Sequence, residues 1–333
     1  MRIAIVTDAW RPQVNGVVTT LGRTVRELEA MGNELLVISP DQFRNVPMPT
    51  YPEIRLALFP ARGVRRKLDA FRPDRIHIAT EGSLGMAARR YCRKRGLRFT
   101  TSYHTQFPEY LRKRLPVPLD VSYGFLRRFH GSAAQTMVAT RKMREALEAR
   151  GFGNFVTWER GVDTETFRPL DGKVTDRENP VWIYVGRVAV EKNLEAFLEL
   201  DLPGTKRIVG AGPQLDEFRD RFPDVDFVGY RFGQELADVV AAGDVFVFPS
   251  LTDTFGLVML EAMACGLPVA AYPVTGPVDV VTPGVTGVLD NDLRKAALAA
   301  LELPREPCRD YALTRTWRRA TEQFFGNLVA ATG

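Results

Sequence analysis

Short apolar runs alternate with amphipathic helical patterns along the whole chain. Residues 245–248 read Val-Phe-Val-Phe, a run of β-branched and aromatic side chains that is typical of a buried strand. Regular alternation of strands and helices predicts parallel sheets covered by helices. The expected strands are residues 2–6, 34–39, 75–79, 98–103, 136–139, 181–185, 206–209, 226–228, 245–248 and 268–271.

A polar, turn-rich stretch at residues 161–180 interrupts this alternation and predicts an interdomain linker. The fold class that we expect is α/β, with two Rossmann-like, doubly wound domains. The first domain is expected over residues 1–164 and the second over residues 165–310, followed by a terminal helical segment at 311–333.

The composition agrees with two well-packed domains, because 45% of the 333 residues are hydrophobic and 26% are charged. No apolar run has spanning length. Residues 3–6 run directly into Thr7 and Asp8, too early for a signal peptide. The three cysteines lack metal-binding spacing, so we expect a protein of the reducing cytoplasm.

The charge is divided unevenly, with a net +13 over residues 1–170 and −8 over the remainder. Basic clusters in the first half stand near aromatic residues such as Phe107, Tyr110, Phe125 and Phe129, a pattern that suits an anionic bilayer. Each single cluster also fits an ordinary solvated helix face, and no nucleic-acid motif accompanies them. The clusters are residues 65–67, 89–90, 93–95, 112–114 and 127–128.

Polar residues of the first half follow expected strands directly. Ligands of open parallel sheets collect at the carboxyl ends of strands, beside helix N-termini that favour phosphates. Asn15 and Gly16 stand where a helix begins, although a plain turn explains this pair equally simply. His104 follows another strand and is a candidate site residue, with a core histidine as the alternative; His77 reads as core, and His130 is unassigned.

Two cations and a glycine turn follow strands of the second half. Arg187 and Lys192 suit a diphosphate, because a guanidinium binds two oxygens and an ammonium supplies a mobile charge. A solvated helix start explains Lys192 poorly, since a cation there opposes the helix dipole. Gly210, Gly212 and Pro213 form a turn that does not complete a Rossmann glycine fingerprint.

The most informative segment carries two carboxylates in an otherwise apolar surrounding. Asp253 lies at the exit of a strand, and Glu261 follows about two helical turns later, where it can accept hydrogen bonds from a ribose diol. The alternatives are that Asp253 is an N-cap and that Glu261 pairs with a core arginine. The backbone N–H groups expected to face a diphosphate are those of Thr254, Phe255, Gly256 and Leu257.

This segment resembles the signature of retaining, nucleotide-sugar-dependent glycosyltransferases of family 4, in which two glutamates are separated by seven residues. Here Asp253 replaces the first glutamate. The resemblance implies the glycosyltransferase B architecture, with two domains facing a central cleft and the terminal helix crossing back to the first domain. It also implies that Asp253 and His104 contact the transferred sugar and that Glu261 holds the ribose.

The resemblance further implies a front-side reaction in which Arg187 and Lys192 stabilise the leaving diphosphate and the loop at Gly16 closes over it. Residues 76–82, 160–163 and 275–277 are similar to bacterial lipid glycosyltransferases, including sulfolipid synthases and α-mannosyltransferases. We therefore expect a UDP-sugar donor and a lipid acceptor such as diacylglycerol at the inner membrane face. GDP-mannose with a lipid or saccharide acceptor is the alternative. Glu81 and Tyr103 are possible acceptor or sugar contacts, and a surface helix cap is the alternative for Glu81.

We expect no cofactor and no obligatory metal, because Asp224 and Asp226 resemble a metal-binding Asp-x-Asp but read as a turn after Pro223. Two other classes stay open. A nucleotide-sugar-binding protein without turnover would have the same pocket, and a dinucleotide oxidoreductase is disfavoured by the incomplete glycine fingerprint.

Overall fold

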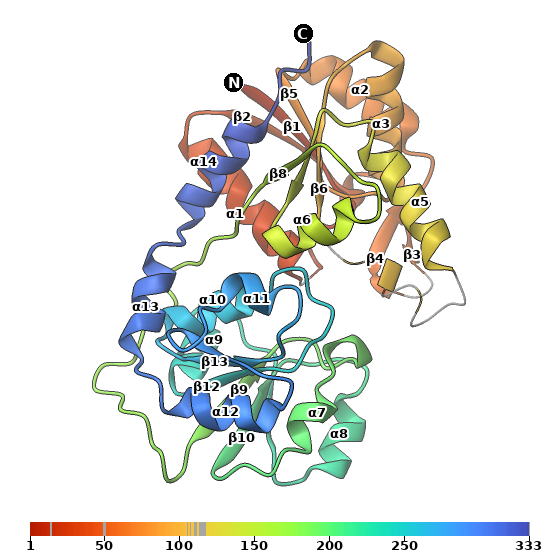
Figure 1. The fold of residues 1–333 in the computed structure, drawn as a ribbon. Helices are drawn as coiled ribbons and strands as arrows, with labels where there is room; N and C mark the ends of the chain where they lie inside the picture. The colour runs from red at the N-terminus through yellow and green to blue at the C-terminus, as the bar shows by residue number, and fades with distance from the viewer. Residues whose placement is uncertain are drawn as a thin grey trace. The chain divides into compact units, whose positions relative to one another are not determined.

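A computed structural model describes residues 1–13, 15–48, 51–104, 106, 108–109, 112 and 118–332, with the backbone alone at 51–53. The chain divides into two compact units, shown in Figure 1. Unit 1 comprises Met1–Arg160 and Trp317–Gly333, and unit 2 comprises Gly161–Thr316. The sequence analysis placed these two boundaries at residues 164 and 310.

Unit 1 is built on a six-stranded parallel sheet in the order β2-β1-β5-β6-β7-β8. Along β1, Ile3 and Ile5 enter one hydrophobic cluster, and Ala4 and Val6 enter the cluster on the opposite face. Both faces of the sheet are therefore buried, as expected for parallel strands. The strands are β1 (Arg2–Val6), β2 (Glu34–Ile38), β5 (Arg75–Ile78), β6 (Thr100–Tyr103), β7 (Gln135–Val138) and β8 (Phe155–Thr157).

Helices cover both faces of this sheet. Leu21 of α1 and Phe324 of α14 share one cluster, and α14 runs beside α1 in Figure 1. Leu68 of α2 and Cys92 of α3 belong to the other cluster. The helices are α1 (Gly16–Ala30), α2 (Ala61–Phe71), α3 (Ser83–Arg95), α5 (Leu119–His130), α6 (Arg141–Glu148) and α14 (Trp317–Asn327), with a short 3-10 helix η1 (Pro40–Gln42).

Unit 2 repeats this plan with a parallel sheet in the order β11-β10-β9-β12-β13-β14. The strands are β9 (Val181–Val185), β10 (Thr205–Val209), β11 (Asp226–Gly229), β12 (Val245–Phe248), β13 (Val269–Ala271) and β14 (Gly287–Leu289). The helices are η2 (Val190–Lys192), α7 (Glu195–Leu198), α8 (Leu215–Arg221), α9 (Gly233–Ala241), α10 (Leu257–Ala264), α11 (Pro277–Val280), α12 (Leu293–Leu301) and α13 (Glu306–Leu313). The expected pair of doubly wound α/β domains is confirmed.

Four strands were absent from the sequence analysis. The antiparallel hairpin of β3 (Asn45–Met48) and β4 (Tyr51–Ala57) contains prolines, which remove hydrogen-bond donors and are typical of loops. The edge strands β8 and β14 have three residues each, too few for a recognisable alternation.

The expected linker at residues 161–180 is part of unit 2. Val162 pairs with Thr316 in an isolated bridge, and Phe167 is buried in the core of unit 2. Arg309 donates hydrogen bonds to the carbonyl groups of Thr164 and Phe167. The polar composition of this segment reflects an irregular backbone held in place by side chains of unit 2. Within the described residues, no helix combines the length and apolarity needed to cross a bilayer.

Candidate active site

The strand order of unit 2 reverses between two neighbouring strands, β9 and β12. The chain proceeds from β9 outward to β10 and β11 and then returns to β12 on the other side of β9. In open α/β sheets, the carboxyl ends of strands at such a reversal are the usual ligand site. The loops that leave β9 and β12 carry Arg187, Lys192 and Asp253.

Lys192 and Asp253 are joined across this reversal. The ammonium Nζ of Lys192 donates to both carboxylate oxygens of Asp253, at 2.6 and 2.8 Å, and the side chains are 22% and 15% exposed. Lys192 ends the 3-10 helix η2, and the left-handed Asn193 that follows donates from its amide to the carbonyl of Pro249. The alternative of a solvated helix start for Lys192 is therefore wrong.

Helix α10 begins later than expected, at Leu257. Its N-cap is Gly256, with φ at 83°, where a Cβ would lie 2.8 Å from the Met259 side chain. Asp253 is therefore not the N-cap, and Thr254 and Phe255 precede the helix. Glu261 begins the second turn of α10 and is partly buried. Only the N–H groups from Leu257 onward belong to the first turn of this helix.

Arg187 and the glycine turn lie at the same end of the sheet. A guanidinium nitrogen of Arg187 lies 3.8 Å from a carboxylate oxygen of Glu191, a buried acid that the sequence analysis did not single out. A Cβ on Gly210 would lie 1.9 Å from the carbonyl oxygen of Gly186, and one on Gly212 would lie 2.2 Å from that of Val188. These glycines let the loops after β9 and β10 touch, which is a packing reason for the motif; Pro213 follows them on the surface.

An aromatic pair that sequence reasoning missed follows β11. The rings of Tyr230 and Phe232 are stacked, with centroids 5.8 Å apart, and both side chains are exposed. The Tyr230 hydroxyl donates to the carbonyl of Ala211 in the glycine turn at 3.3 Å. The sequence signal was their position, because both aromatic residues follow an expected strand at residues 226–228 and ligands of open parallel sheets collect at the carboxyl ends of strands.

Unit 1 has a corresponding reversal between β1 and β5. Asp8 follows β1, and its carboxylate accepts hydrogen bonds from the Thr80 hydroxyl at 2.9 Å and from the backbone N–H groups of Leu84 and Gly85 at 2.9 and 3.3 Å. Burial raises the pKa of Asp8, and these hydrogen bonds oppose that effect. Asp8 thus occupies the start of α3, while Asn15 caps α1 by accepting from the N–H groups of Val17 and Val18.

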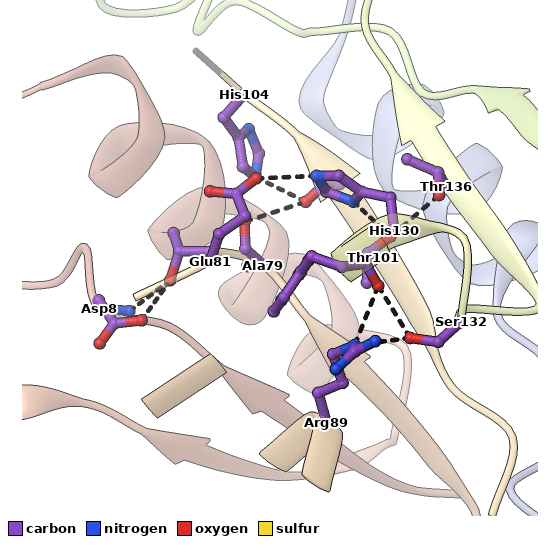
Figure 2. A network of polar contacts seen from close by, with 12 residues as sticks. Asp8, Ala79, Glu81, Arg89, Thr101, His104, His130, Ser132 and Thr136 are labelled. Carbon is purple, nitrogen blue, oxygen red and sulfur yellow. Dashed lines mark hydrogen bonds and ion pairs between the residues drawn. The ribbon is translucent and has the colours of Figure 1, made fainter. Parts of the chain in front are cut away.

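His104 follows β6 and joins a polar network, part of which Figure 2 shows. Its Nε2 lies 2.8 Å from the Ser102 hydroxyl, which lies 3.0 Å from Nε2 of His77. Its Nδ1 lies 3.3 Å from a guanidinium nitrogen of Arg160. Burial and then the Arg160 charge lower the pKa of His104 well below its ordinary value. His77 is fully buried, as expected for a core histidine.

Glu81 and His130 form a second polar contact beside His104 (Figure 2). Nε2 of His130 lies 3.0 Å from a carboxylate oxygen of Glu81, and Nδ1 lies 2.9 Å from the Thr101 hydroxyl. Gly82 is the N-cap of α3, so the alternative of a helix cap for Glu81 is wrong. Tyr103 is only 1% exposed and packs against His130, so the fold uses this side chain in the core.

A cavity of about 890 Å³ lies between α2 and α3 on unit 1. Five of its lining residues are basic, none is acidic, and Phe59 at its edge is 95% exposed. The guanidinium of Arg89 is buried and bonded to Ser132 and to carbonyl groups of α5, so Arg89 does not offer its charge to a bilayer. The basic lining residues are Arg62, Arg89, Arg90, Arg93 and Lys94.

The other aromatic and basic residues that we expected at a membrane surface differ in their exposure to solvent. Phe129 is buried in the core of unit 1, whereas Phe125 is exposed. Phe107, Tyr110, Lys113 and Arg114 lie outside the described residues.

Asp226 begins β11 and is paired with Arg207. The described part of the chain holds no cluster of three or more His, Cys, Asp or Glu side chains able to bind a metal.

Two doubly wound units with charged side chains at the carboxyl ends of their strands have the architecture of the glycosyltransferase B class. Residues 14–166 match the family model described as Glycosyltransferase Family 4, and residues 179–303 match that described as Glycosyl transferases group 1. The chain belongs to the family 4 glycosyltransferases. It is a hexosyltransferase that uses a sugar-nucleotide donor.

Three relatives illustrate the range of this family. A GDP-mannose-dependent alpha-mannosyltransferase of Mycobacterium tuberculosis is 31% identical, over 100% of this chain and 97% of the relative. Sulfoquinovosyl transferase SQD2 of Arabidopsis thaliana is 31% identical over 84% of this chain and 61% of the relative. An alpha-monoglucosyldiacylglycerol synthase of Acholeplasma laidlawii is 28% identical over 81% and 79%.

Solved structures share the fold over nearly the whole chain. Sucrose-phosphate synthase from Thermosynechococcus elongatus superposes with a TM-score of 0.79 at 20% identity, covering 98% of this chain and 97% of that structure. Anabaena HepE in complex with UDP and glucose has a TM-score of 0.71 at 17% identity, covering 98% of each chain. At these identities the likeness establishes the architecture.

Proposed function

We propose that this enzyme transfers mannose from GDP-mannose to a lipid-linked acceptor with retention of the anomeric configuration. The observation that carries the proposal is the ion pair of Lys192 and Asp253, beside Arg187 at the strand-order reversal of unit 2. The mannosyltransferase relative that aligns over the full length favours GDP-mannose. The sequence analysis favoured a UDP-sugar over GDP-mannose, and the present proposal reverses that order.

The chemistry of these three side chains suits a departing diphosphate. The Lys192 ammonium has three N–H donors, so it can serve the Asp253 carboxylate and a phosphate oxygen together. Each carboxylate oxygen of Asp253 has two acceptor positions, so a sugar hydroxyl can bind there beside the ammonium. Arg187 adds a second cation, and electrostatic stabilisation of the leaving group is usually the largest contribution to such a reaction.

We also propose roles for the other predicted donor contacts. Glu261, in the second turn of α10, is proposed to accept hydrogen bonds from the ribose diol. The stacked pair of Tyr230 and Phe232 offers a flat surface for a nucleobase, with stacking worth about 1–3 kcal/mol per base. His104 remains our predicted contact to the sugar, and Asn15 and Gly16 remain predicted contacts of the diphosphate.

The basic cavity between α2 and α3 supports a lipid acceptor and a peripheral position at the cytoplasmic membrane face. Its exposed cations lie beside the exposed Phe59 and Met86 and combine charge with apolar surface, as an anionic bilayer requires; they are Arg62, Arg90, Arg93 and Lys94. Each cation near such a surface contributes about 1 kcal/mol. We propose no nucleic-acid partner, no cofactor and no obligatory metal.

A second candidate function is transfer from a UDP-sugar to diacylglycerol. The names of the sulfoquinovosyl transferase and the glucosyldiacylglycerol synthase favour it, as does the UDP bound to HepE. Asp253 occupies the position at which the family pattern has a glutamate, and its shorter side chain changes the reach to the sugar. A panel of donors distinguishes the two candidates.

The test is a donor panel followed by transfer to lipid. Thermal stabilisation of the protein by GDP-mannose but not by UDP-sugars, with mannose then appearing in the lipid fraction, is the expected result. Stabilisation by UDP-sugars and transfer to diacylglycerol would establish the second candidate.

Arg187→Ala should lower kcat about 100-fold with a smaller change in donor affinity, because the arginine acts mainly on the negative charge that develops on the leaving diphosphate. Chelation of divalent metals should leave the rate unchanged.

A further inference from the structure

Arg160 is a buried cation at the end of unit 1. It is 5% exposed, and one guanidinium nitrogen donates to the carbonyl groups of Trp158 at 2.5 Å and Glu159 at 3.2 Å. The other terminal nitrogen lies 3.3 Å from Nδ1 of His104, and the group lies over the Trp158 ring at 4.4 Å. Among the described residues, no carboxylate forms an ion pair with Arg160.

Such a residue is costly to the fold. A buried charge without a counterion loses its hydration, and only carbonyl groups, an imidazole and a ring compensate for it here. Burial lowers the pKa of Arg160 to about 9, so the guanidinium is still protonated at neutral pH. It therefore acts as a hydrogen-bond donor to His104.

This contact decides the tautomer of His104. A guanidinium can only donate, so Nδ1 of His104 must accept, and the single proton of the neutral ring is on Nε2. Nε2 then donates to the Ser102 hydroxyl, which can donate onward to Nε2 of His77 or to the carbonyl of Ala79. Figure 2 shows His104 beside the Glu81 and His130 contact.

Among the described residues, several charged and titratable groups lie around His104. They are Arg160 after β8, His77 of β5, and His130 of α5 with its partner Glu81. Protonation of His104 would place a second N–H at Nδ1, directed at the guanidinium 3.3 Å away. Arg160 thus opposes the imidazolium by charge and by hydrogen-bond geometry.

We propose that Arg160 is a positioning residue for sugar transfer, holding His104 neutral, with its proton on Nε2 and its ring in one orientation. The retention of an uncompensated buried cation is explained by this task. The relevance to catalysis rests on the proposed contact of His104 with the donor sugar. The state of the imidazole itself does not depend on that contact.

Nuclear magnetic resonance of ¹⁵N-histidine in the full chain tests the proposal directly. The protein has three histidines, so His77→Gln and His130→Gln variants assign the signals. We expect the His104 ring to be the Nε2–H tautomer and its pKa to lie well below the ordinary histidine value. A His104 that carries its proton on Nδ1, or that titrates near 6.5, would overturn the proposal without any variant of Arg160.

Arg160→Met should raise the pKa of His104 toward its ordinary value without fully restoring it, because burial is the larger cause of the lowering and persists in the variant. Arg160→Lys should keep it neutral, because an ammonium also donates and repels the imidazolium. Arg89→Met is the matched control, since Arg89 is also buried and bonded to carbonyl groups of unit 1. It should lower stability without changing the titration of His104.

A measurement of activity against pH tests whether the neutral form of His104 is needed for sugar transfer. Partial protonation of His104 should make the Arg160→Met variant slower at pH 6 than at pH 8, relative to wild type. The limit is about fourfold, reached if the pKa of His104 returned to about 6.5. Rescue of the pH profile by Arg160→Lys is expected. An equal loss at both pH values would assign Arg160 a purely structural role. Failure of transfer from every donor would instead contradict the proposed function and leave the resonance result standing.

Discussion

Lys192 and Asp253 lie 61 residues apart in the sequence, and the ammonium of one donates to both carboxylate oxygens of the other. They meet because β9 and β12 are neighbours in the sheet and each residue follows its strand. Both side chains are largely shielded from solvent, so their attraction is only weakly screened. The pair links the two loops that we propose to hold the diphosphate and the sugar.

Removing either partner should destabilise unit 2, and removing both should cost less than the sum. We expect Lys192→Met and Asp253→Asn each to cost about 1–3 kcal/mol, with a coupling of at least about 0.5 kcal/mol between them. Calorimetric unfolding of the two single variants and the double variant measures this. The exposed pair Arg177 and Glu302 of unit 2 is the control, for which no coupling should be detectable. Additive losses at Lys192 and Asp253 would contradict the pairing.

Glu261→Gln should weaken donor binding more than it slows turnover. A carboxylate is a stronger acceptor for ribose hydroxyls than an amide, and hydrogen bonds to charged groups contribute about 1.5–3 kcal/mol. We expect the Kd for the nucleotide to rise at least about tenfold, with kcat at saturating donor within about threefold of wild type. Calorimetric titration with the free nucleotide measures the Kd. Glu235→Gln, on the exposed start of α9, should leave it unchanged.

Gly210→Ala should disrupt the contact of two loops in unit 2. A Cβ there would lie 1.9 Å from the carbonyl oxygen of Gly186, and both partners are backbone. We expect a marked fall in melting temperature together with loss of donor binding. Gly22→Ala is the opposite case, since the added methyl group meets nothing within 4 Å inside α1 and should stabilise the protein by about 0.5–1 kcal/mol. A tolerated Gly210→Ala would contradict the packing role of the glycine turn.

Stability should fall as the solution is acidified below about pH 6.5. Burial lowers the pKa of His77 to about 3, and the Arg160 charge acts in the same direction. The unfolded chain binds a proton at this histidine near pH 6.5 and the folded chain does not, so stability is lost as the pH falls from about 6.5 toward 3. At pH 5 the loss is about 2 kcal/mol. His77→Gln should reduce the slope of melting temperature against pH, leaving the part contributed by His104; an unchanged slope would refute this origin.

The sequence carried most of the information about the individual strands and about which residues follow them. Strands β1, β9 and β12 have the predicted bounds, because alternating burial on two faces leaves a pattern in neighbouring residues. The same reasoning placed His104, Lys192 and Asp253 at carboxyl ends of strands. It could not find three-residue edge strands such as β8, whose pairing depends on a neighbour far along the chain.

The partners of the polar residues were decided by the tertiary structure alone. Asp8 binds the start of α3, His130 pairs with Glu81, and Arg160 reaches His104, and in each case the two residues are separated by about 50 residues or more. Local patterns determine whether a residue lies on a strand, a helix or a turn. Which side chains meet depends on strand order and crossover connections, and these follow from the packing of whole sheets rather than from any short segment.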